Sequence, residues 1–296
     1  MNILLTGATG FVGEHLSKYL LTQNHTIFAL VRPTSNLDYL NTHHIPYFCF
    51  QNDVNELSEF LQAEKIDGII HLSSLFLSQH KIHEVPLLIQ TNVLFSTQVL
   101  EAACQAKTRW FINTGTFWQH FQTNGYSPVN LYAATKQAFE DIARYYWETY
   151  PIHFTNLLLS DTFGPGDKRP KLLALLKKIS STNEHFPMSP GEQTIDISYI
   201  DNVVEAFATL AKLVDNDTQA TYKGQSFAVR ATKRVTLKEL VAIFEKVSGK
   251  KLDIGWGELS YRPREIMIPW SEGIPVPGWK PSISLEEGIA LFLAEN

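Results

Sequence analysis

Residues 1–21 have the sequence MNILLTGATGFVGEHLSKYLL, and this stretch decides the expected fold. Its first five residues form a short, mostly apolar run, which is typical of a strand buried in a parallel sheet. Gly7, Gly10 and Gly13 follow and lead into an amphipathic helical pattern. A strand, a glycine-rich turn and a helix in this order are the setting of a dinucleotide-binding turn. A merely tight turn between strand and helix is the alternative.

Each of the three glycines has a separate expected role in such a turn. Gly7 would allow the tight bend, and Gly10 would let a pyrophosphate approach the backbone. Gly13 would let the helix pack closely on the strand. The phosphates would then lie at the positive N-terminal end of the helix.

The composition excludes several classes of protein. At 296 residues the chain can bury the core of one or two domains, and its net charge of −5 argues against a nucleic-acid-binding surface. No apolar run approaches the roughly 18 residues of a membrane span, and the N-terminus lacks the basic region of a signal peptide. Cys49 and Cys104 are too few for a disulfide framework, and no metal-binding spacing occurs. We therefore expect a cytoplasmic protein with no membrane partner and no metal site.

Further strands are expected after the glycine turn, each followed by a helix. They cover residues 26–32, 47–50, 67–74 and 109–118. This alternation predicts an α/β fold with a doubly wound parallel sheet. Ligands of such sheets bind at the carboxyl ends of the strands, where Thr114 and Thr116 fall.

The alternation ends near residue 163, and the sequence predicts two domains. The dinucleotide-binding domain would comprise residues 1–163 plus about 195–230. A smaller α+β substrate domain would comprise about 164–194 plus 231–296.

Three polar residues of the N-terminal half have open interpretations. Arg32 ends the second strand where NAD-binding proteins usually carry Asp or Glu, and an arginine there can pair with the 2′-phosphate of NADP. NADP is therefore expected, with NAD possible and a solvated arginine as the alternative. Asp53 could hydrogen-bond an adenine amino group or cap the next helix. His71 lies inside an apolar strand and is expected to be a satisfied core histidine.

Tyr132 and Lys136 lie four residues apart in a segment with a helical pattern. This spacing brings their side chains together on one face of a helix. The pair would suit a catalytic acid with the cation that tunes it, and would equally suit an ordinary surface pair. The spacing alone leaves both interpretations open.

Segments spread over nearly the whole chain resemble the extended short-chain dehydrogenase/reductases, also called the NAD-dependent epimerase/dehydratase family. The matching segments, in order, are TGATGFVG at 6–13, DV at 53–54, HLSS at 71–74, TNV at 91–93, Thr114, YAATK at 132–136, FGPGD at 163–167, SYIDNVVEAF at 198–207 and GWKPSISLEEGIALFL at 278–293. Within the family, the chain is most similar to nucleotide-sugar 4-ketoreductases of deoxysugar biosynthesis. The resemblance implies a Rossmann-type fold.

The resemblance also implies a set of site residues. Thr114, Tyr132 and Lys136 would be the catalytic triad. The expected cofactor contacts are Gly7, Thr9, Gly10, Phe11, Val12, Gly13, Arg32, Asp53, Val54, Leu72, Ser73, Ser74, Asn92, Tyr132 and Lys136. The expected substrate contacts are Phe76, Thr114, Thr116, Trp118, Asp161, Lys171, Leu172 and Arg262, where Arg262 would bind phosphate unless it is a surface arginine.

These residues imply a mechanism for ketone reduction. Hydride transfer leaves an alkoxide that needs a proton, and Tyr132 would supply it as the general acid. A free tyrosine has a pKa near 10, and a neighbouring ammonium lowers it, so Lys136 is expected to lower the pKa of Tyr132. The Thr114 hydroxyl would orient the ketone, with Thr116 as the alternative.

The expected function is NADPH-dependent reduction of a keto group, at C4, on a nucleotide-linked deoxyhexulose. Gly115 and Thr116 stand where dehydratases of the family carry an acidic pair, so elimination of water is not expected. A sugar-nucleotide epimerase is the first alternative, and a non-catalytic NADP-binding sensor is an alternative of another class.

Two further expectations concern the substrate and the assembly. The family often carries an arginine where this chain has Ile195, which leaves the identity of the nucleotide open. In relatives, the helices that begin near Asn92 and Tyr132 form a dimer face, so a homodimer is expected.

Overall fold

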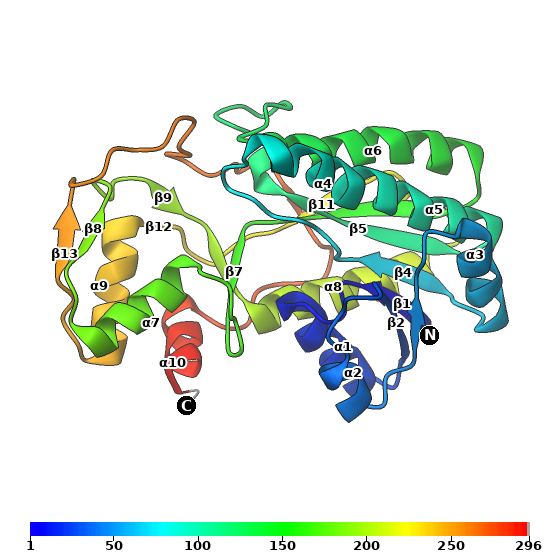
Figure 1. Cartoon of the computed structure of the whole chain (residues 1–296), viewed down its shortest axis with the longest axis horizontal. Helices are drawn as coiled ribbons and strands as arrows, with labels where there is room; N and C mark the ends of the chain where they lie inside the picture. The colour runs from blue at the N-terminus through cyan, green and yellow to red at the C-terminus, as the bar shows by residue number, and fades with distance from the viewer. Residues whose placement is uncertain (295–296) are drawn as a thin grey trace.

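The computed structural model describes residues 1–294, and its centre is a sheet of eight strands in which every neighbouring pair is parallel (Figure 1). In spatial order the strands are β14 (Ile274–Pro275), β11 (Ser226–Val229), β6 (His153–Leu159), β5 (Trp110–Thr116), β4 (Gly68–His71), β1 (Asn2–Thr6), β2 (Thr26–Val31) and β3 (Tyr47–Cys49). The order reverses between β1 and β4, as in doubly wound nucleotide-binding sheets. The predicted Rossmann-type fold is confirmed.

Helices cover both faces of this sheet. One face carries α3 (Val54–Ala63), α5 (Phe95–Gln105) and α6 (Leu131–Thr149), and the other carries α1 (Phe11–Thr22), α2 (Asp38–Thr42) and α8 (Ile200–Asp215). Alternate side chains of β1 serve the two faces, because Ile3 and Leu5 belong to one core cluster and Leu4 to the other. Burial on both faces explains why the strands are nearly continuous apolar runs.

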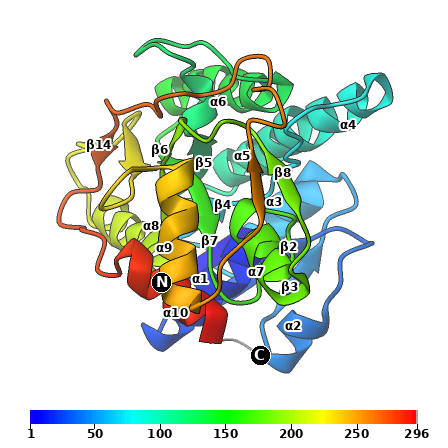
Figure 2. The same ribbon diagram turned by 90° about the vertical axis from the view of Figure 1, so that its left-hand side faces the viewer.

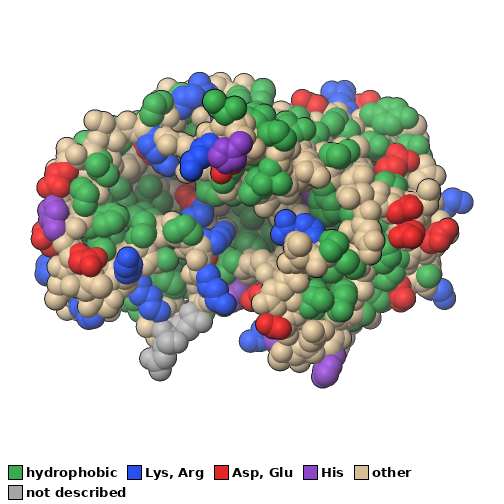
Figure 3. Space-filling model, in the orientation of Figure 1, with side chains coloured by type: hydrophobic (Ala, Val, Ile, Leu, Met, Phe, Trp, Pro, Cys, Tyr) green, Lys and Arg blue, Asp and Glu red, His purple; other side chains and the backbone are tan. Residues whose placement is uncertain are grey.

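A smaller part of the molecule stands beyond the carboxyl ends of the central strands (Figure 2). It contains the helices α7 (Leu172–Thr182), α9 (Leu237–Ser248) and α10 (Leu285–Ala294), and the short strands β7 (Asp161–Phe163), β8 (Phe186–Met188), β9 (Thr194–Ile195), β10 (Ile197–Tyr199), β12 (Val235–Thr236) and β13 (Ile254–Trp256). Figure 3 shows a hollow between this part and the large sheet. The two-domain division stays a prediction, and β14, from its C-terminal portion, extends the large sheet.

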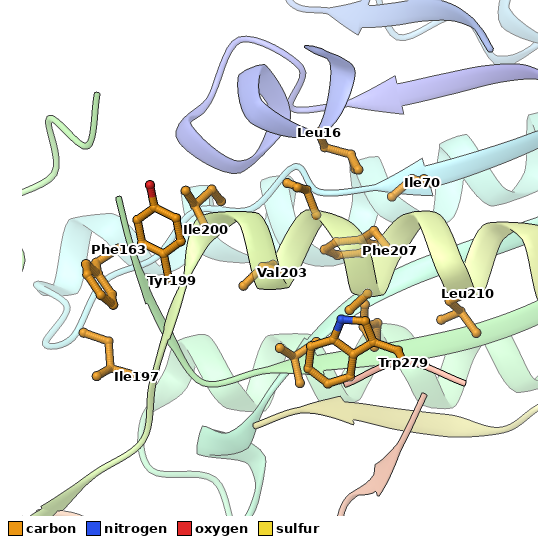
Figure 4. Packing of buried hydrophobic residues seen from close by; sticks show 14 of the residues in the cluster. Leu16, Ile70, Phe163, Ile197, Tyr199, Ile200, Val203, Phe207, Leu210 and Trp279 are labelled. Carbon is orange, nitrogen blue, oxygen red and sulfur yellow. The ribbon is translucent and has the colours of Figure 1, made fainter. Parts of the chain in front are cut away.

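One apolar cluster is shared by the large sheet and the smaller part of the molecule (Figure 4). Helix α8 presents Ile200, Val203, Phe207 and Leu210 at helical spacing toward α1 and the sheet. Phe163 and Tyr199 continue the same cluster into the smaller part, where they pack edge to face with ring centroids 5.6 Å apart. The smaller part is therefore packed onto the sheet and not merely tethered to it.

The helical segment between β4 and β5 is not a uniform α-helix. It comprises η1 (Ile82–Glu84), α4 (Val85–Ile89), the π-helical turn η2 (Gln90–Leu94) and α5, and the short η3 (Phe117–Gln119) follows β5. Asn92 lies in the π-helical turn, a feature that local sequence pattern did not indicate. Within residues 1–294, no helix is both long and apolar enough to span a bilayer.

Gly68 is held by the packing of the neighbouring strand. It lies opposite Trp110 in the register of β4 and β5, and a Cβ at this position would stand 2.0 Å from the indole ring. The indole is fully buried and is fixed by a hydrogen bond from its Nε1 to Asp215 Oδ1, at 2.9 Å. The ring therefore has no room to retreat.

We expect Gly68→Ala to lower the free energy of unfolding by about 1–3 kcal/mol, because overpacking forces backbone and ring to shift. Urea denaturation of the purified protein measures this. Gly125→Ala is the control, since the nearest atom to its new Cβ would be Thr123 Oγ1 at 3.8 Å. Equal stability of the two variants would contradict the packing argument.

Candidate active site

An open crevice of about 1030 Å³ lies at the carboxyl ends of the central strands, in the hollow of Figure 3. It brings together fourteen of the predicted site residues, which are Gly7, Gly10, Phe11, Val12, Gly13, Leu72, Ser74, Phe76, Thr114, Thr116, Trp118, Tyr132, Asp161 and Lys171. They come from five separate segments of the chain. The crevice is therefore the candidate site.

The glycine-rich turn forms one end of the crevice. Gly7 has a φ of +70°, and a Cβ on Gly13 would stand 2.1 Å from the Gly7 carbonyl oxygen. Helix α1 begins at Phe11 without a side-chain cap, so the first backbone N–H groups of the helix have no capping side chain. A bare turn with uncapped N–H groups fits the diphosphate of a dinucleotide.

A chain of buried hydrogen bonds supports the strand ends beside this turn. The Ser73 backbone N–H donates to Thr6 Oγ1 at 3.0 Å, and Thr6 Oγ1 lies 2.9 Å from His71 Nδ1. His71 Nε2 lies 2.8 Å from Ser96 Oγ, which donates to the Asn92 carbonyl oxygen at 3.0 Å. Because the Ser96 hydroxyl proton is already used, Nε2 carries the imidazole proton and Nδ1 accepts from Thr6.

His71 is accordingly a neutral core histidine, as predicted. Burial holds the pKa of His71 well below its usual range, and the charge of Lys136 lowers it further. Both ring nitrogens have protein partners.

Asn92 fastens the segment after β4 to α6. Its Oδ1 accepts from the Leu75 backbone N–H at 2.8 Å, and its Nδ2 donates to the Leu75 carbonyl at 3.0 Å and to Thr135 Oγ1 at 2.9 Å. The side chain is buried and its polar atoms already have protein partners. Its geometry is that of a residue that positions Ser74, whose hydroxyl also donates to Asn92 Oδ1, at 3.4 Å.

Tyr132 projects into the crevice from the first turn of α6. Burial raises the pKa of Tyr132 to about 12; hydrogen bonds with the side chains of Ser74 and Thr116 act in the opposite direction, and the charge of Asp161 adds to the rise. The expectation that Lys136 lowers this pKa is not met, because the cost of burying a phenolate outweighs the favourable contacts. Tyr132 is a protonated phenol at neutral pH, the form that a general acid requires.

Lys136 lies one turn further along α6 and is almost fully buried, with 1% of its surface exposed. Burial lowers the pKa of Lys136 to about 8, and the charge of Glu140 opposes this shift. The alternative of an exposed surface pair is wrong, since one member is buried and the other lines the crevice.

The two threonines of β5 differ in their partners. Thr116 Oγ1 accepts from the Trp118 backbone N–H at 3.3 Å, capping η3, and its side chain also bonds the Tyr132 phenol. Thr114 Oγ1 is buried and has no hydrogen-bond partner in the described residues. A buried hydroxyl without a hydrogen-bond partner is costly unless a ligand supplies one. Of the two threonines, Thr114 therefore has the hydroxyl that is free to bind a ligand.

Aromatic side chains form the wall beside Tyr132. The ring of Phe76 lies 5.1 Å from that of Tyr132 and 5.3 Å from that of Trp118. Lys171 Nζ lies 4.6 Å from the Phe76 centroid and donates to Asp161 Oδ1 at 2.7 Å. Leu172 begins α7 beside them and lines an adjoining cavity of about 460 Å³.

Arg262 lies outside the crevice, in an adjacent cavity of about 790 Å³ that shares Trp118 and Asp161 with it. Its guanidinium is paired with Glu265, from Nε to Oε2 and from Nη2 to Oε1, both at 3.0 Å. Ile195 lines the same cavity. A ligand phosphate would have to compete with Glu265 for this arginine.

The remaining predicted residues do not line the crevice. Arg32 follows the carboxyl end of β2 and is exposed. Asp53 Oδ1 accepts from the Asn55 and Glu56 backbone N–H groups at 2.8 and 3.2 Å, so the helix-capping interpretation holds for it. Thr9 lies within the turn, and Val54 begins α3.

Sequence reasoning missed Arg169 and Glu140. Arg169 lines the crevice with its guanidinium 4.5 Å from the Phe11 ring centroid, and it donates from Nε to Asp167 Oδ1 at 2.7 Å. Glu140 follows Lys136 by one turn and has a buried oxygen without a partner. Neither had a sequence signal, apart from the place of Glu140 on the helical face of Lys136.

Comparisons with known proteins agree on the family. The sequence profile of the NAD-dependent epimerase/dehydratase family matches residues 3–223. CDP-abequose synthase of Salmonella muenchen is 29% identical over 99% of this chain and 97% of its own length. The probable UDP-glucuronate 4-epimerase of Rhizobium meliloti (strain 1021) is 24% identical over 99% and 96%.

A solved structure shares the fold. The UDP-glucuronic acid 4-epimerase of Bacillus cereus, solved in complex with UDP-glucuronic acid and NAD, superposes with a TM-score of 0.83. The alignment covers 99% of this chain and 98% of the other at 22% identity.

Gly13→Ala is expected to lower affinity for a nicotinamide dinucleotide at least tenfold, because the new Cβ would force α1 away from the Gly7 carbonyl. Isothermal titration with NADPH and NAD measures this, with Gly125→Ala as control. Unchanged affinity in a folded Gly13→Ala protein would exclude the turn as the dinucleotide site.

Proposed function

The chain belongs to the NAD-dependent epimerase/dehydratase family, and from that premise we propose that it reduces a C4 keto group on a nucleotide-linked deoxyhexulose with NADPH. The family and its relatives make it an NAD(P)-dependent enzyme of the oxidoreductase and epimerase type. The observation that carries the finer proposal is the unpartnered Thr114 hydroxyl at the same crevice as the Tyr132 phenol. A ketone oxygen would supply the missing acceptor.

The proposed cofactor site uses the bare glycine turn for the diphosphate. Arg32 would take a 2′-phosphate, since its exposed side chain stands where a carboxylate would select NAD. Arg169 adds a cation beside Phe11, at the start of α1, and Lys136 would hold the nicotinamide ribose. When bound, NADPH supplies the hydride.

The chain's own residues would supply orientation and a proton. Thr114 Oγ1 would donate to the ketone oxygen and fix its position. Tyr132 would hold its proton at the phenol oxygen until the alkoxide develops and then transfer it. Thr116 and Ser74, which bond the phenol, would keep it aimed at the reacting atom.

The proposed substrate site extends from the aromatic wall to the cavity with Arg262. Similarity to CDP-abequose synthase along the whole chain supports a nucleotide-linked sugar, with Arg262 as the phosphate contact. Phe76 and Trp118 offer apolar surface beside Tyr132, which suits a deoxygenated sugar ring. Ile195 stands where the family often carries an arginine, so the phosphate region has one cation fewer. The identity of the nucleotide base has to be determined by experiment.

Epimerisation at C4 is the second candidate, supported by the similarity to UDP-glucuronate 4-epimerase. The same three side chains could serve it. Two incubations separate the candidates: NADPH with a panel of UDP, dTDP, CDP and GDP 4-keto sugars, and NAD with the corresponding 4-hydroxy sugars. Stoichiometric NADPH oxidation in the first supports reduction, whereas interconversion of C4 epimers in the second, without net cofactor change, supports epimerisation.

We also propose a homodimer and a cytoplasmic location. Leu87, Leu94 and Tyr145 are exposed apolar residues on α4, η2 and α6, elements that lie side by side. Such a surface suits an isologous contact between two copies. The free thiols of Cys49 and Cys104 agree with a reducing compartment.

Tyr132→Phe should lower kcat for ketone reduction by about 10²–10⁴-fold, because the proton donor is lost. Tyr145→Phe, an exposed change on the same helix, serves as control. Full activity in the Tyr132→Phe protein would remove the proposed acid, and absence of turnover in wild type with every keto sugar would favour the sensor.

Arg32→Gln should weaken NADPH binding about tenfold and leave NADH binding unchanged, because a charge-assisted phosphate contact is lost. Titration of both cofactors against wild type and variant measures the ratio. An equal loss for both cofactors would assign Arg32 to some other part of the dinucleotide.

A further inference from the structure

Glu140 lies directly behind the strand that carries the two threonines. Its Oε1 is buried without a hydrogen-bond partner, and a Cβ on Gly115 would stand 3.0 Å from it. Gly115 lies between Thr114 and Thr116 and lines the crevice. The carboxyl group therefore sits on the protein side of the catalytic strand end, separated from the crevice by one glycine.

Gln119 completes the surroundings of this carboxyl. Its side-chain oxygen accepts from the Thr116 backbone N–H at 2.8 Å, and its Nε2 donates to Gln137 Oε1 at 2.9 Å. Burial raises the pKa of Glu140 to about 7, while a hydrogen bond with Gln119 and then the charge of Lys136 oppose the rise, and Asp141 adds to it. The hydrogen bond with Gln119 holds the Glu140 carboxyl group in place, but it offsets only part of the effect of burial on the pKa.

Lys136 needs a negative partner because its ammonium is buried. His71 of β4, whose pKa the charge of Lys136 lowers, is neutral, and Tyr132, one turn earlier on the same helix, is a phenol. The adjoining segment of β5 has no ionisable side chain, and Asp161 acts on the phenol. Among the described residues, Glu140 is the acid whose charge acts on Lys136.

We propose that Glu140 is the buried counter-ion of Lys136, a positioning residue that keeps the ammonium protonated beside Tyr132 and so sets the upper pH limit of the reaction. The inference rests on the proposed function, because it assigns the charge on Lys136 a part in turnover. Glu140 itself does not line the crevice.

The geometry explains how the pair works without direct contact. The two side chains are one helical turn apart and form no ion pair within 4.0 Å in the part of the chain that the structure describes. Across such a gap a charge still acts strongly, because little water screens it. No hydrogen bond offsets the charge on Oε1, and a Cβ at position 115 would stand 3.0 Å from this oxygen.

The test is the pH profile of kcat/KM for Glu140→Gln, which keeps the shape and removes the charge. In wild type, activity should fall as the pH rises through the pKa of Lys136, about 8, since the ammonium is lost there. In Glu140→Gln the fall in activity should occur at a pH about one unit lower, because removal of the negative charge lowers the pKa of Lys136. One unit is the lower end of the effect of a nearby opposite charge on a pKa. Near pH 6 the two proteins should have similar activity.

Two matched variants separate charge from structure. Glu140→Asp keeps the charge and should leave the limb close to that of wild type. Glu148→Gln removes an exposed carboxylate of the same helix, paired with Arg144, and should shift nothing. An unshifted limb in Glu140→Gln, or an equal loss at every pH, would assign Glu140 a merely structural role and overturn the inference.

A direct titration makes the result independent of turnover. NMR of lysine labelled at Cε, with the Lys136 signal assigned from Lys136→Met, gives the pKa of the ammonium in wild type and in Glu140→Gln. A lower pKa in the variant supports the counter-ion even if no sugar substrate is found, and an unchanged pKa refutes it. Failure of the proposed function would instead appear as absence of keto-sugar turnover in wild type.

Discussion

The parallel direction of all eight central strands is the constraint on which the rest of the structure depends. Parallel strands need crossover helices, and those helices bury both faces of the sheet. Only the strand ends are then left for chemistry, and all the carboxyl ends lie at one edge. The glycine turn after β1, Thr114 and Thr116 on β5, and Asp161 after β6 meet there for this reason.

Burial then sets the electrostatics of that edge. It raises the pKa of Tyr132, lowers that of Lys136 and keeps His71 neutral, so each group departs from its ordinary value in the direction that disfavours charge. Hydrogen bonds reduce these costs where the chain provides them. Oε1 of Glu140 and the hydroxyl of Thr114 are buried without a hydrogen-bond partner, and both adjoin the reacting centre that we propose.

The smaller part of the molecule is joined to this edge by specific contacts. His15 Nε2 lies 2.9 Å from the Pro165 carbonyl oxygen, and Arg169 stacks on Phe11 at the start of α1. Lys171 reaches across to Phe76, which contacts Tyr132. The segment of residues 163–171 therefore contacts both α1, which follows the glycine turn, and the aromatic wall beside Tyr132.

The sequence by itself determined the features that depend on local periodicity. Apolar runs and glycines in the first 21 residues specified a strand, a turn and a helix, and their repetition specified the sheet. The spacing of Tyr132 and Lys136 put both on one helical face, and the ordered segments identified the family. Such patterns are readable because each involves residues only a few positions apart.

Tertiary structure alone decided which polar groups have partners and which do not. It left the Thr114 hydroxyl free and engaged that of Thr116, and it reversed the expected pKa shift of Tyr132. It also brought Glu140 against Gly115 and Arg169 against Phe11. Burial and partner choice depend on segments that are distant in the chain and meet only in the folded protein, so no local pattern encodes them.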